Sequence, residues 1–197
     1  MCFDEGENKM ELKKYKIRAN STTAVIWNVM KKSIADEIKK LKKSELTEWE
    51  ENNWVKKAET HGKKVFIPAR WVKSMLINSA KHTRLIPHFA TSKKETFTRY
   101  IQSTIVPLDY EVCSTNDLKA YGAFVGAQGK NSSTKVWRVR PILEKWHMEF
   151  ELIDPAGRMS VDELKTLVEY GGMFEGIGDN RSNNFGRFEV ESIRKVN

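Results

Sequence analysis

The sequence predicts a single domain of the α+β class, built on an antiparallel sheet that carries helices on one face. Two observations in the last third of the chain support this class. Apolar and polar residues alternate over 136–140, 146–154 and 186–194, as they do in strands with one buried face. A helix is expected between the last two of these segments, because Ser160 and Glu163 form a capping box ahead of apolar residues at helical spacing.

The first half of the chain also alternates between strands and helices. Residues 12–19 and 63–67 predict strands, and residues 69–81 predict a helix with Pro68 in its first turn. Between the two strands, residues 24–57 predict a long helical insertion. Its apolar residues recur at helical spacing and are Ile34, Ile38, Leu41, Leu46 and Trp49.

The remaining segments are connections and one further strand. Residues 85–94 predict a loop, and residues 96–106 predict a strand because they are rich in β-branched and aromatic side chains. Residues 122–134 contain several glycines and serines and predict a flexible loop. Pro141 is expected to end the strand that precedes it, and the glycine pair at 171–172 to end the preceding helix. All 197 residues are expected to form one domain.

Positive charge is concentrated in one part of the chain. The 34 basic and 26 acidic residues give a net charge of +8. Between Lys56 and Arg99 there are eleven basic residues and only two acidic ones, so this segment alone carries +9. Such a field predicts a polyanionic partner, most often nucleic acid. The alternative is a lysine-rich surface that only faces water.

Several classes of protein are excluded by composition. Cys2 and Cys113 are the two cysteines, too few for a disulfide framework, and no zinc-binding spacing is present. No apolar run approaches the roughly 18–20 residues that span a bilayer. The first residues have neither the basic nor the apolar region of a secretory signal. We therefore expect a cytoplasmic protein with no metal, no cofactor and no membrane partner.

A glycine-rich loop is expected between the last helix and the last strand. Five glycines fall within residues 171–186, so the backbone there must bend sharply or approach something closely. The loop lacks the Gly-Lys-Ser/Thr of a phosphate-binding P-loop, and it leads into a strand, unlike a dinucleotide-binding fingerprint. Its polar centre suits a phosphate backbone. The alternative is a tight connection in which the glycines only allow packing.

Two motifs resemble the RAMP superfamily of CRISPR-associated proteins. Gly176-Ile177-Gly178, then five residues, then Asn184-Phe185-Gly186 is similar to that family's C-terminal loop, in which two Gly-hydrophobic-Gly steps are separated by five residues. Here Asn184 replaces one glycine, and asparagine tolerates positive φ well. Upstream, residues 64–73 resemble the strand, Ile-Pro step and lysine-bearing helix of the subunits that coat CRISPR RNA, although Ala69-Arg70-Trp71 replaces their Gly-Ser-Ser.

The resemblance implies a ferredoxin-like core of the RNA-recognition type, with helical and loop elaborations. In the coating subunits, the Ile-Pro helix and the glycine loop line the groove for guide RNA, and copies stack along the strand. No tract of this sequence matches the family's long thumb hairpin. These departures indicate a divergent member, stand-alone or phage-encoded, whose partners are single-stranded RNA or DNA, copies of itself and other CRISPR-complex subunits.

The expected nucleic-acid contacts lie mainly on the Ile-Pro helix, on one strand and in the glycine loop. Arg70 and Lys73 are one helical turn apart and project from the same side. Trp71 and Trp137 are candidates for base stacking, or else for the core. The other expected contacts are Lys81, Arg84, Arg138, Arg140, Gly176, Gly178, Asn180, Arg181, Asn184 and Arg187. For the charged residues the alternative is an ordinary solvated face.

Three functional hypotheses follow. The first is a non-catalytic nucleic-acid-binding protein that resembles the coating subunits and polymerises along single-stranded RNA. The second is a metal-independent endoribonuclease of the kind found in the same superfamily, with His82 or His88 as acid–base, although a lone histidine is more often structural. The third is a phage-encoded mimic that binds and inhibits a host CRISPR complex.

Overall fold

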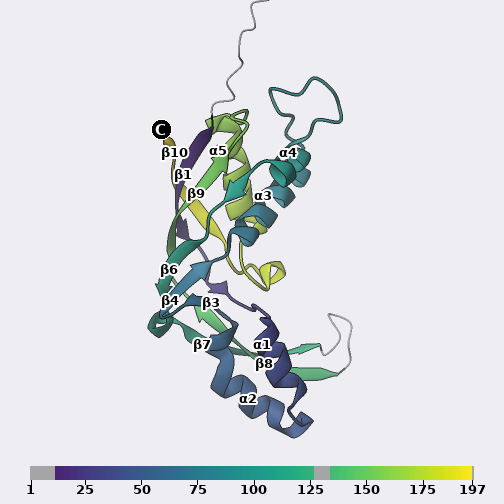
Figure 1. Ribbon diagram of the computed structural model, residues 1–197, viewed down its shortest axis with the longest axis vertical. Coiled ribbons are helices and arrows are strands. Elements are labelled where there is room, and N and C mark those ends of the chain that lie inside the picture. The colour runs from purple at the N-terminus through teal and green to yellow at the C-terminus, as the bar shows by residue number, and fades with distance from the viewer. Residues whose placement is uncertain (1–11, 127–133, 197) are drawn as a thin grey trace, which may run out of the picture.

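The computed structural model describes residues 12–126 and 134–196, and predictions for residues 1–11 and 127–133 lie outside this part. Three antiparallel sheets and five α-helices make up the described chain, so the α+β class is confirmed. Figure 1 shows an elongated molecule, with the largest sheet and three helices toward one end and two further helices toward the other. That all of this forms one domain stays a prediction.

The largest sheet has the strand order β10-β1-β9-β5. On β1 and β9 every second residue is buried; on β1 these residues are Tyr15, Ile17 and Ala19. The strands predicted over 12–19, 146–154 and 186–194 are confirmed here. The bounds of the four strands are Lys13–Ser21 for β1, Val106–Pro107 for β5, His147–Asp154 for β9 and Phe188–Val196 for β10.

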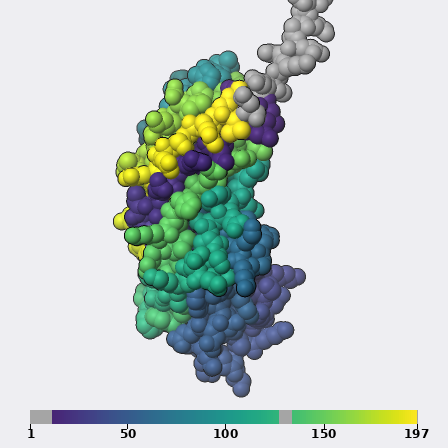
Figure 2. All heavy atoms as spheres, turned by 90° about the vertical axis from the view of Figure 1, so that its left-hand side faces the viewer, coloured from purple at the N-terminus to yellow at the C-terminus, as the bar shows by residue number. Residues whose placement is uncertain are grey.

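Helices cover one face of this sheet. They are α3 (Ala69–Thr83), α4 (Phe97–Ser103) and α5 (Val161–Tyr170), which lie on the same side in Figure 1. Figure 2 shows the opposite face, where β10, β1 and β9 form the surface. The buried side chains of the sheet and the helices form one apolar cluster, so the predicted arrangement of helices on one face holds for this sheet.

The strand predicted over 96–106 is wrong, because most of this segment is helix α4. The Thr96 hydroxyl caps the helix by accepting the amide N–H of Arg99 at 3.3 Å. Phe97, Tyr100 and Ile101 are buried, and their spacing of three and four residues places them on one helical face. That periodicity outweighs the β-branched composition of the segment.

Helix α5 ends at Tyr170, directly before the glycine pair as predicted, but the glycines do not end the helical path of the chain. After α5 the chain continues as a π-helical turn, η4 (Gly171–Glu175), and turns only at Gly176, where φ is +65°. A Cβ on Gly171 would lie 2.8 Å from the Met75 side chain on α3. The first two glycines therefore allow this turn to pack closely against its neighbours rather than stopping the helix.

Two three-stranded sheets make up much of the rest of the molecule. One has the order β2-β8-β7, with β2 at Val25–Ile26, β7 at Lys119–Gly126 and β8 at Lys135–Leu143. The other has the order β3-β4-β6, with β3 at Glu59–His61, β4 at Lys64–Ile67 and β6 at Tyr110–Ser114. The strand predicted over 63–67 is confirmed as β4.

Strands β7 and β8 pair from Lys119 with Ile142 to Gly126 with Lys135, and this corrects two predictions. The expected loop at 122–134 begins in strand β7, and its residues 127–133 lie outside the described chain. Gly122 is needed in the strand because a Cβ there would lie 2.3 Å from the Trp137 ring. Pro141 does not end β8, because it pairs with Ala120 and its carbonyl accepts the Trp27 N–H. A long hairpin is therefore present.

The helical insertion is only partly confirmed. Residues 25–26 belong to β2, and the helical part is broken into four pieces: α1 (Lys32–Lys39), η1 (Lys43–Glu45), α2 (Leu46–Asn53) and η2 (Trp54–Lys57). Buried Lys57 forms an ion pair with buried Glu50 and donates to the Val139 carbonyl at 2.8 Å. This pair fixes α2 and η2 against β8. None of the described helices is long and apolar enough to cross a membrane.

Candidate nucleic-acid interface

The glycine-rich loop has five residues in the left-handed region of backbone space. Their φ values are +65° at Gly176, +88° at Gly178, +58° at Asn180, +62° at Asn184 and +74° at Gly186. Asparagine is one of the few residues that adopts this conformation readily. The expectation that Asn184 substitutes for a glycine at positive φ is therefore confirmed.

The close approaches of the loop are to the protein's own backbone. A Cβ on Gly178 would lie 2.7 Å from the Ile26 carbonyl oxygen on β2, and one on Gly176 would lie 2.8 Å from that of Phe185. The amide of Asp179 donates to Ile26 at 2.9 Å, and the amide of Gly186 donates to Ala24 at 2.7 Å. Packing against the protein's own backbone thus explains the shape of the turn, so a role in binding has to come from the side chains of the loop.

Those side chains line a cavity of about 560 Å³, which we name the loop cavity. It lies between the glycine-rich loop and the β7–β8 hairpin. Five expected contact residues meet there, while Gly176 and Asn184 belong to the loop but do not line it. The lining residues are Val125, Arg140, Phe174, Glu175, Gly178, Asp179, Asn180, Arg181, Ser182 and Arg187.

Three arginines and two carboxylates face the loop cavity, which leaves a positive excess. The Arg140 Nη1 lies 3.1 Å from the Asp179 Oδ2. Arg187 Nη2 donates to the Arg181 carbonyl at 3.2 Å, whereas its buried Nη1 has no hydrogen-bond partner among residues 12–126 and 134–196. Burial lowers the pKa of Arg187, although nearby Glu175 opposes this. A buried guanidinium nitrogen without an acceptor is suited to an anionic oxygen.

Sequence reasoning missed one aromatic residue of the loop cavity. Phe174 lines the cavity although its side chain is 55% exposed, and its ring centroid lies 4.8 Å from that of Tyr170. An exposed ring beside arginines is a platform on which a nucleobase can stack. The signal in the sequence was a phenylalanine flanked by glycines and polar residues, where no core position was expected.

The two candidate histidines are each held by a glutamate. The Nδ1 of His82, at the end of α3, lies 2.6 Å from the Oε1 of Glu175, which also lines the loop cavity. The Nδ1 of His88 lies 2.8 Å from the Oε2 of Glu163, the capping-box residue of α5. His82 therefore contacts a residue that lines the cavity, whereas His88 contacts the first turn of α5.

The other expected contacts lie outside the loop cavity. Arg70 Nη2 lies 3.1 Å from the Glu59 Oε2, and Arg138 Nη1 lies 2.8 Å from the Oε1 of buried Glu50. Each of these arginines therefore already has an acidic partner. Lys73, on α3, is half-buried. Lys81 and Arg84 line a different pocket at the end of α3.

The two candidate tryptophans both pack against other rings. Trp71 is half-buried, with its ring centroid 6.2 Å from that of buried Trp27. The ring centroid of Trp137 lies 5.0 Å from that of Phe124 on the neighbouring strand, and Phe124 is 70% exposed. Trp71 is therefore part of the core edge, while Trp137 supports an exposed ring on the hairpin. Within the described ranges, no three metal-ligating side chains of His, Cys, Asp or Glu gather into a group.

Comparison with known proteins gives a similarity of fold. No model of a protein family matches the chain, and no curated protein matches it in sequence. The structure is similar to a chain in the cryo-EM structure of the Type III-B Cmr-beta bound to cognate target RNA, with a TM-score of 0.52 and 13% sequence identity. The match covers 94% of this chain and 61% of that chain. This shared fold agrees in outline with the RAMP resemblance of the two sequence motifs.

Proposed function

We propose that this protein binds single-stranded RNA without cleaving it, and that the loop cavity is the place where it holds the strand. The single observation that carries the proposal is the convergence of Arg140, Arg181 and Arg187 around one cavity that also has an exposed ring, Phe174. Cations that neutralise phosphates and aromatic rings that stack on bases are the two components of single-strand binding without sequence preference.

The unpartnered nitrogen of Arg187 adds a specific reason to expect a phosphate. Leaving a buried donor unpaired costs about 1–3 kcal/mol, and a phosphate oxygen would remove that cost. Asn180 and Ser182 line the same cavity and supply further donors. The acidic side chains are fewer than the arginines, so an anion entering the cavity meets a net attraction.

The fold similarity supports the same class of function. The chain with the similar fold comes from an assembly that is bound to RNA. We extend this to a RAMP-like, CRISPR-associated role, in which copies of the protein, or this protein with other subunits, lie along one RNA strand. The proposal for polymerisation rests on this similarity and on the two sequence motifs, and not on a contact between two copies of the protein.

Fluorescence anisotropy with a labelled uridine 20-mer tests the proposal. Replacing Phe174 with serine should weaken binding by roughly 5- to 150-fold, the cost of losing one stacked base at about 1–3 kcal/mol. Met173→Ser is the matched control, because Met173 is the adjacent residue, is 63% exposed and does not line the loop cavity. Equal affinities of the two variants would contradict the role of the loop cavity. The same titration with a thymidine 20-mer measures the preference for RNA over DNA.

A second candidate function is metal-independent RNA cleavage. The observation that favours it is the contact of His82 with Glu175, because a carboxylate at Nδ1 orients the ring and leaves Nε2 to move a proton. Cleavage of a hairpin RNA in the presence of EDTA, lost in His82→Ala and kept in His88→Ala, would establish it. Intact RNA after prolonged incubation with the wild-type protein would exclude it and leave binding alone.

A further inference from the structure

The wall of the loop cavity contains a carboxylate that is largely removed from water. The Glu175 side chain is 14% exposed and lines the cavity beside Phe174. A carboxylate in such a position needs a hydrogen-bond donor to offset the loss of hydration. The donor is His82 on α3, whose Nδ1 lies 2.6 Å from the Glu175 Oε1. Because an ionised carboxylate only accepts hydrogen bonds, the Nδ1 of His82 carries the hydrogen and donates it.

Packing between α3 and η4 fixes the position of this pair. A Cβ on Gly171, the first residue of η4, would lie 2.8 Å from the Met75 side chain on α3. The rings of His82 and Tyr170 lie side by side, with their centroids 6.3 Å apart. The backbone that carries Glu175 and the ring that holds its carboxylate are therefore both restrained.

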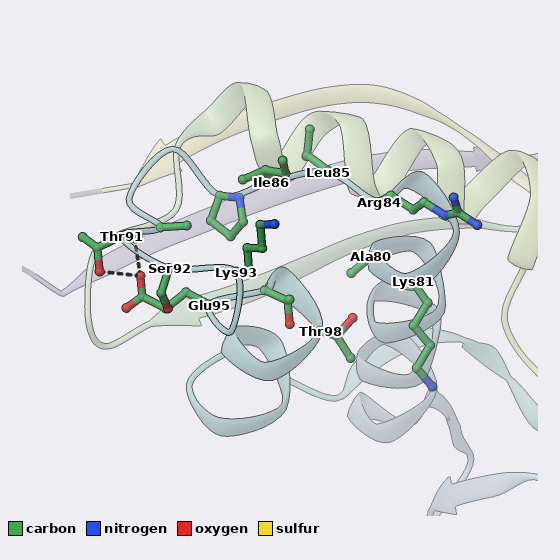
Figure 3. Close-up of a pocket in the computed structure, with 13 residues that line it drawn as sticks. Ala80, Lys81, Arg84, Leu85, Ile86, Thr91, Ser92, Lys93, Glu95 and Thr98 are labelled. Atoms are coloured by element: carbon green, nitrogen blue, oxygen red, sulfur yellow. Dashed lines mark hydrogen bonds between the residues drawn. The ribbon is translucent and has the colours of Figure 1, made fainter.

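The cations next to His82 in sequence do not take its place. Figure 3 shows Lys81 and Arg84 projecting from the end of α3, away from the loop residues drawn with them. Among the residues that the structure describes, neither forms an ion pair with Glu175, and neither lines the loop cavity. His82 is therefore the residue of this helix end that holds the carboxylate.

Arg187 is the alternative partner for Glu175. Both side chains line the loop cavity. Burial lowers the pKa of Arg187, and the negative charge of Glu175 opposes this shift, so the carboxylate already acts on the guanidinium. The buried Nη1 of Arg187 has no acceptor within residues 12–126 and 134–196. Since carboxylates and guanidinium groups form strong charge-assisted hydrogen bonds, Glu175 released from His82 would compete with a phosphate for this nitrogen.

We propose that His82 is a positioning residue of the loop cavity, which holds the Glu175 carboxylate so that Arg187 stays available to a phosphate of the bound strand. This inference rests on the proposed RNA binding and adds to it a residue that does not itself line the cavity. The affinity for RNA then depends on a hydrogen bond behind the cavity wall, between α3 and η4.

Fluorescence anisotropy with the labelled uridine 20-mer tests this role through a pair of substitutions. His82→Ala should weaken binding by about tenfold, because the released carboxylate neutralises Arg187. Glu175→Gln should bind at least as tightly as wild type, since a neutral amide does not neutralise a guanidinium group. The variant with both substitutions should match Glu175→Gln within about twofold. A loss caused by His82→Ala that is equally large with and without Glu175 would overturn the proposal.

Two further variants separate positioning from a general effect on the fold. His88→Ala is the matched control, because His88 Nδ1 also contacts a glutamate, Glu163 at 2.8 Å, and His88 does not line the loop cavity. It should bind RNA like wild type. His82→Asn keeps an N–H donor close to the position of Nδ1, so it should retain most of the affinity. The His82 side chain is 58% exposed, so its variants should fold, which circular dichroism verifies.

Electrophoresis after each titration shows whether the RNA is intact, which separates binding from cleavage. Wild-type affinity in His82→Ala would overturn this inference alone, whereas a wild-type protein that does not bind the 20-mer would contradict the proposed function as well. A crystal structure of free His82→Ala gives a readout without RNA. It should show the Glu175 carboxylate hydrogen-bonded to Arg187 at about 2.7–2.9 Å. A carboxylate that stays away from Arg187 in that structure would overturn the inference.

Discussion

Gly178 has two separate reasons to be glycine. Its φ of +88° disfavours any residue with a Cβ, and the added Cβ would also press on the Ile26 carbonyl at 2.7 Å. Gly62 has a φ of +61°, but a Cβ there would meet nothing within 4 Å. The two glycines therefore separate the cost of backbone strain from the cost of a clash.

Substituting each of these glycines with alanine should show this difference. Gly62→Ala is expected to cost about 1–2 kcal/mol of unfolding free energy, the strain of a left-handed residue. Gly178→Ala should cost at least about 1 kcal/mol more, because the loop must move away from β2. Urea denaturation of both variants measures the difference. Equal losses would mean that the loop shifts freely and that its position on β2 is not fixed.

The arginines of β8 show what residue patterns could not foresee. The alternation of Arg138 and Arg140 along the strand predicts that both project from one sheet face, and this suggested a surface open to an anion. Each also has an acidic partner, Glu50 for Arg138 and Asp179 for Arg140, and only Arg140 lines the loop cavity. These partners are 88 and 39 positions away in sequence, so the pairing depends on the tertiary fold and leaves no local signal.

At the scale of elements, local signals were sufficient where caps and alternation agreed. The capping box at Ser160, the Ile67-Pro68 step and the alternation over 146–154 all predicted elements that the structure contains. Residues 96–106 were misassigned because composition was weighed above the helical spacing of their buried residues. The strand at 119–126 was missed because Gly122 and its neighbours were assigned to a loop, while the ring that requires this glycine comes from β8.

The ion pair between Glu50 and Lys57 should hold the helical insertion in place. Burial lowers the pKa of the Lys57 amine, and Glu50 opposes this shift. Lys57→Met leaves the Glu50 carboxylate buried without that partner, and it should cost about 3–5 kcal/mol of unfolding free energy. Lys56→Met is the control, because exposed Lys56 pairs with Glu37 at the surface, and it should cost about 0–1 kcal/mol. Urea unfolding of both variants measures their free energies of unfolding. Similar values would contradict the role of the Glu50–Lys57 ion pair in holding the insertion.

The capping carboxylate of α5 should make stability depend on pH. Burial raises the pKa of Glu163, but hydrogen bonds from the amides of His88 and Ser160 outweigh burial and lower that pKa from its usual value of 4.5. The folded-state pKa is then below the unfolded one, so the stabilisation is present above pH 4.5 and is lost as the pH falls through the folded-state pKa.

Glu163→Gln should therefore cost about 1 kcal/mol at pH 7 and much less at about pH 3. The matched control is Glu169→Gln on the same helix, where the Glu169 Oε1 lies 3.8 Å from Lys165 Nζ at the surface. The free energy of unfolding of each variant is measured in urea at both pH values. A Glu163→Gln deficit that stays the same at low pH would show that the carboxylate charge has no part in capping.

At the scale of the whole molecule, folding places residues that are far apart in the sequence around one cavity. The loop cavity combines Val125 and Arg140 from the hairpin with the segment 174–187. The glycine loop and four of its cavity residues could be named from the sequence, because the motif there is local. Arg140 was named as well, but its place beside the loop, in the wall supplied by the hairpin, could not be predicted, since it depends on the three-sheet arrangement. The sequence also suggested that Arg70 and the glycine loop belong to one interface. In the structure, Arg70 does not line the loop cavity.

The salt dependence of RNA binding by Arg181→Ala tests the central claim most directly. Arg181 lines the loop cavity, and removing its side chain leaves the backbone of the loop unchanged, so the melting temperature should stay nearly the same. The control variant is Arg194→Ala, an exposed arginine on β10 outside the cavity. The account predicts weaker binding for Arg181→Ala and a slope of log K against log salt that is smaller by about 0.7, the value for one phosphate contact on a single strand. Binding by Arg181→Ala that equals wild type at every salt concentration would contradict the assignment of the loop cavity as the nucleic-acid site.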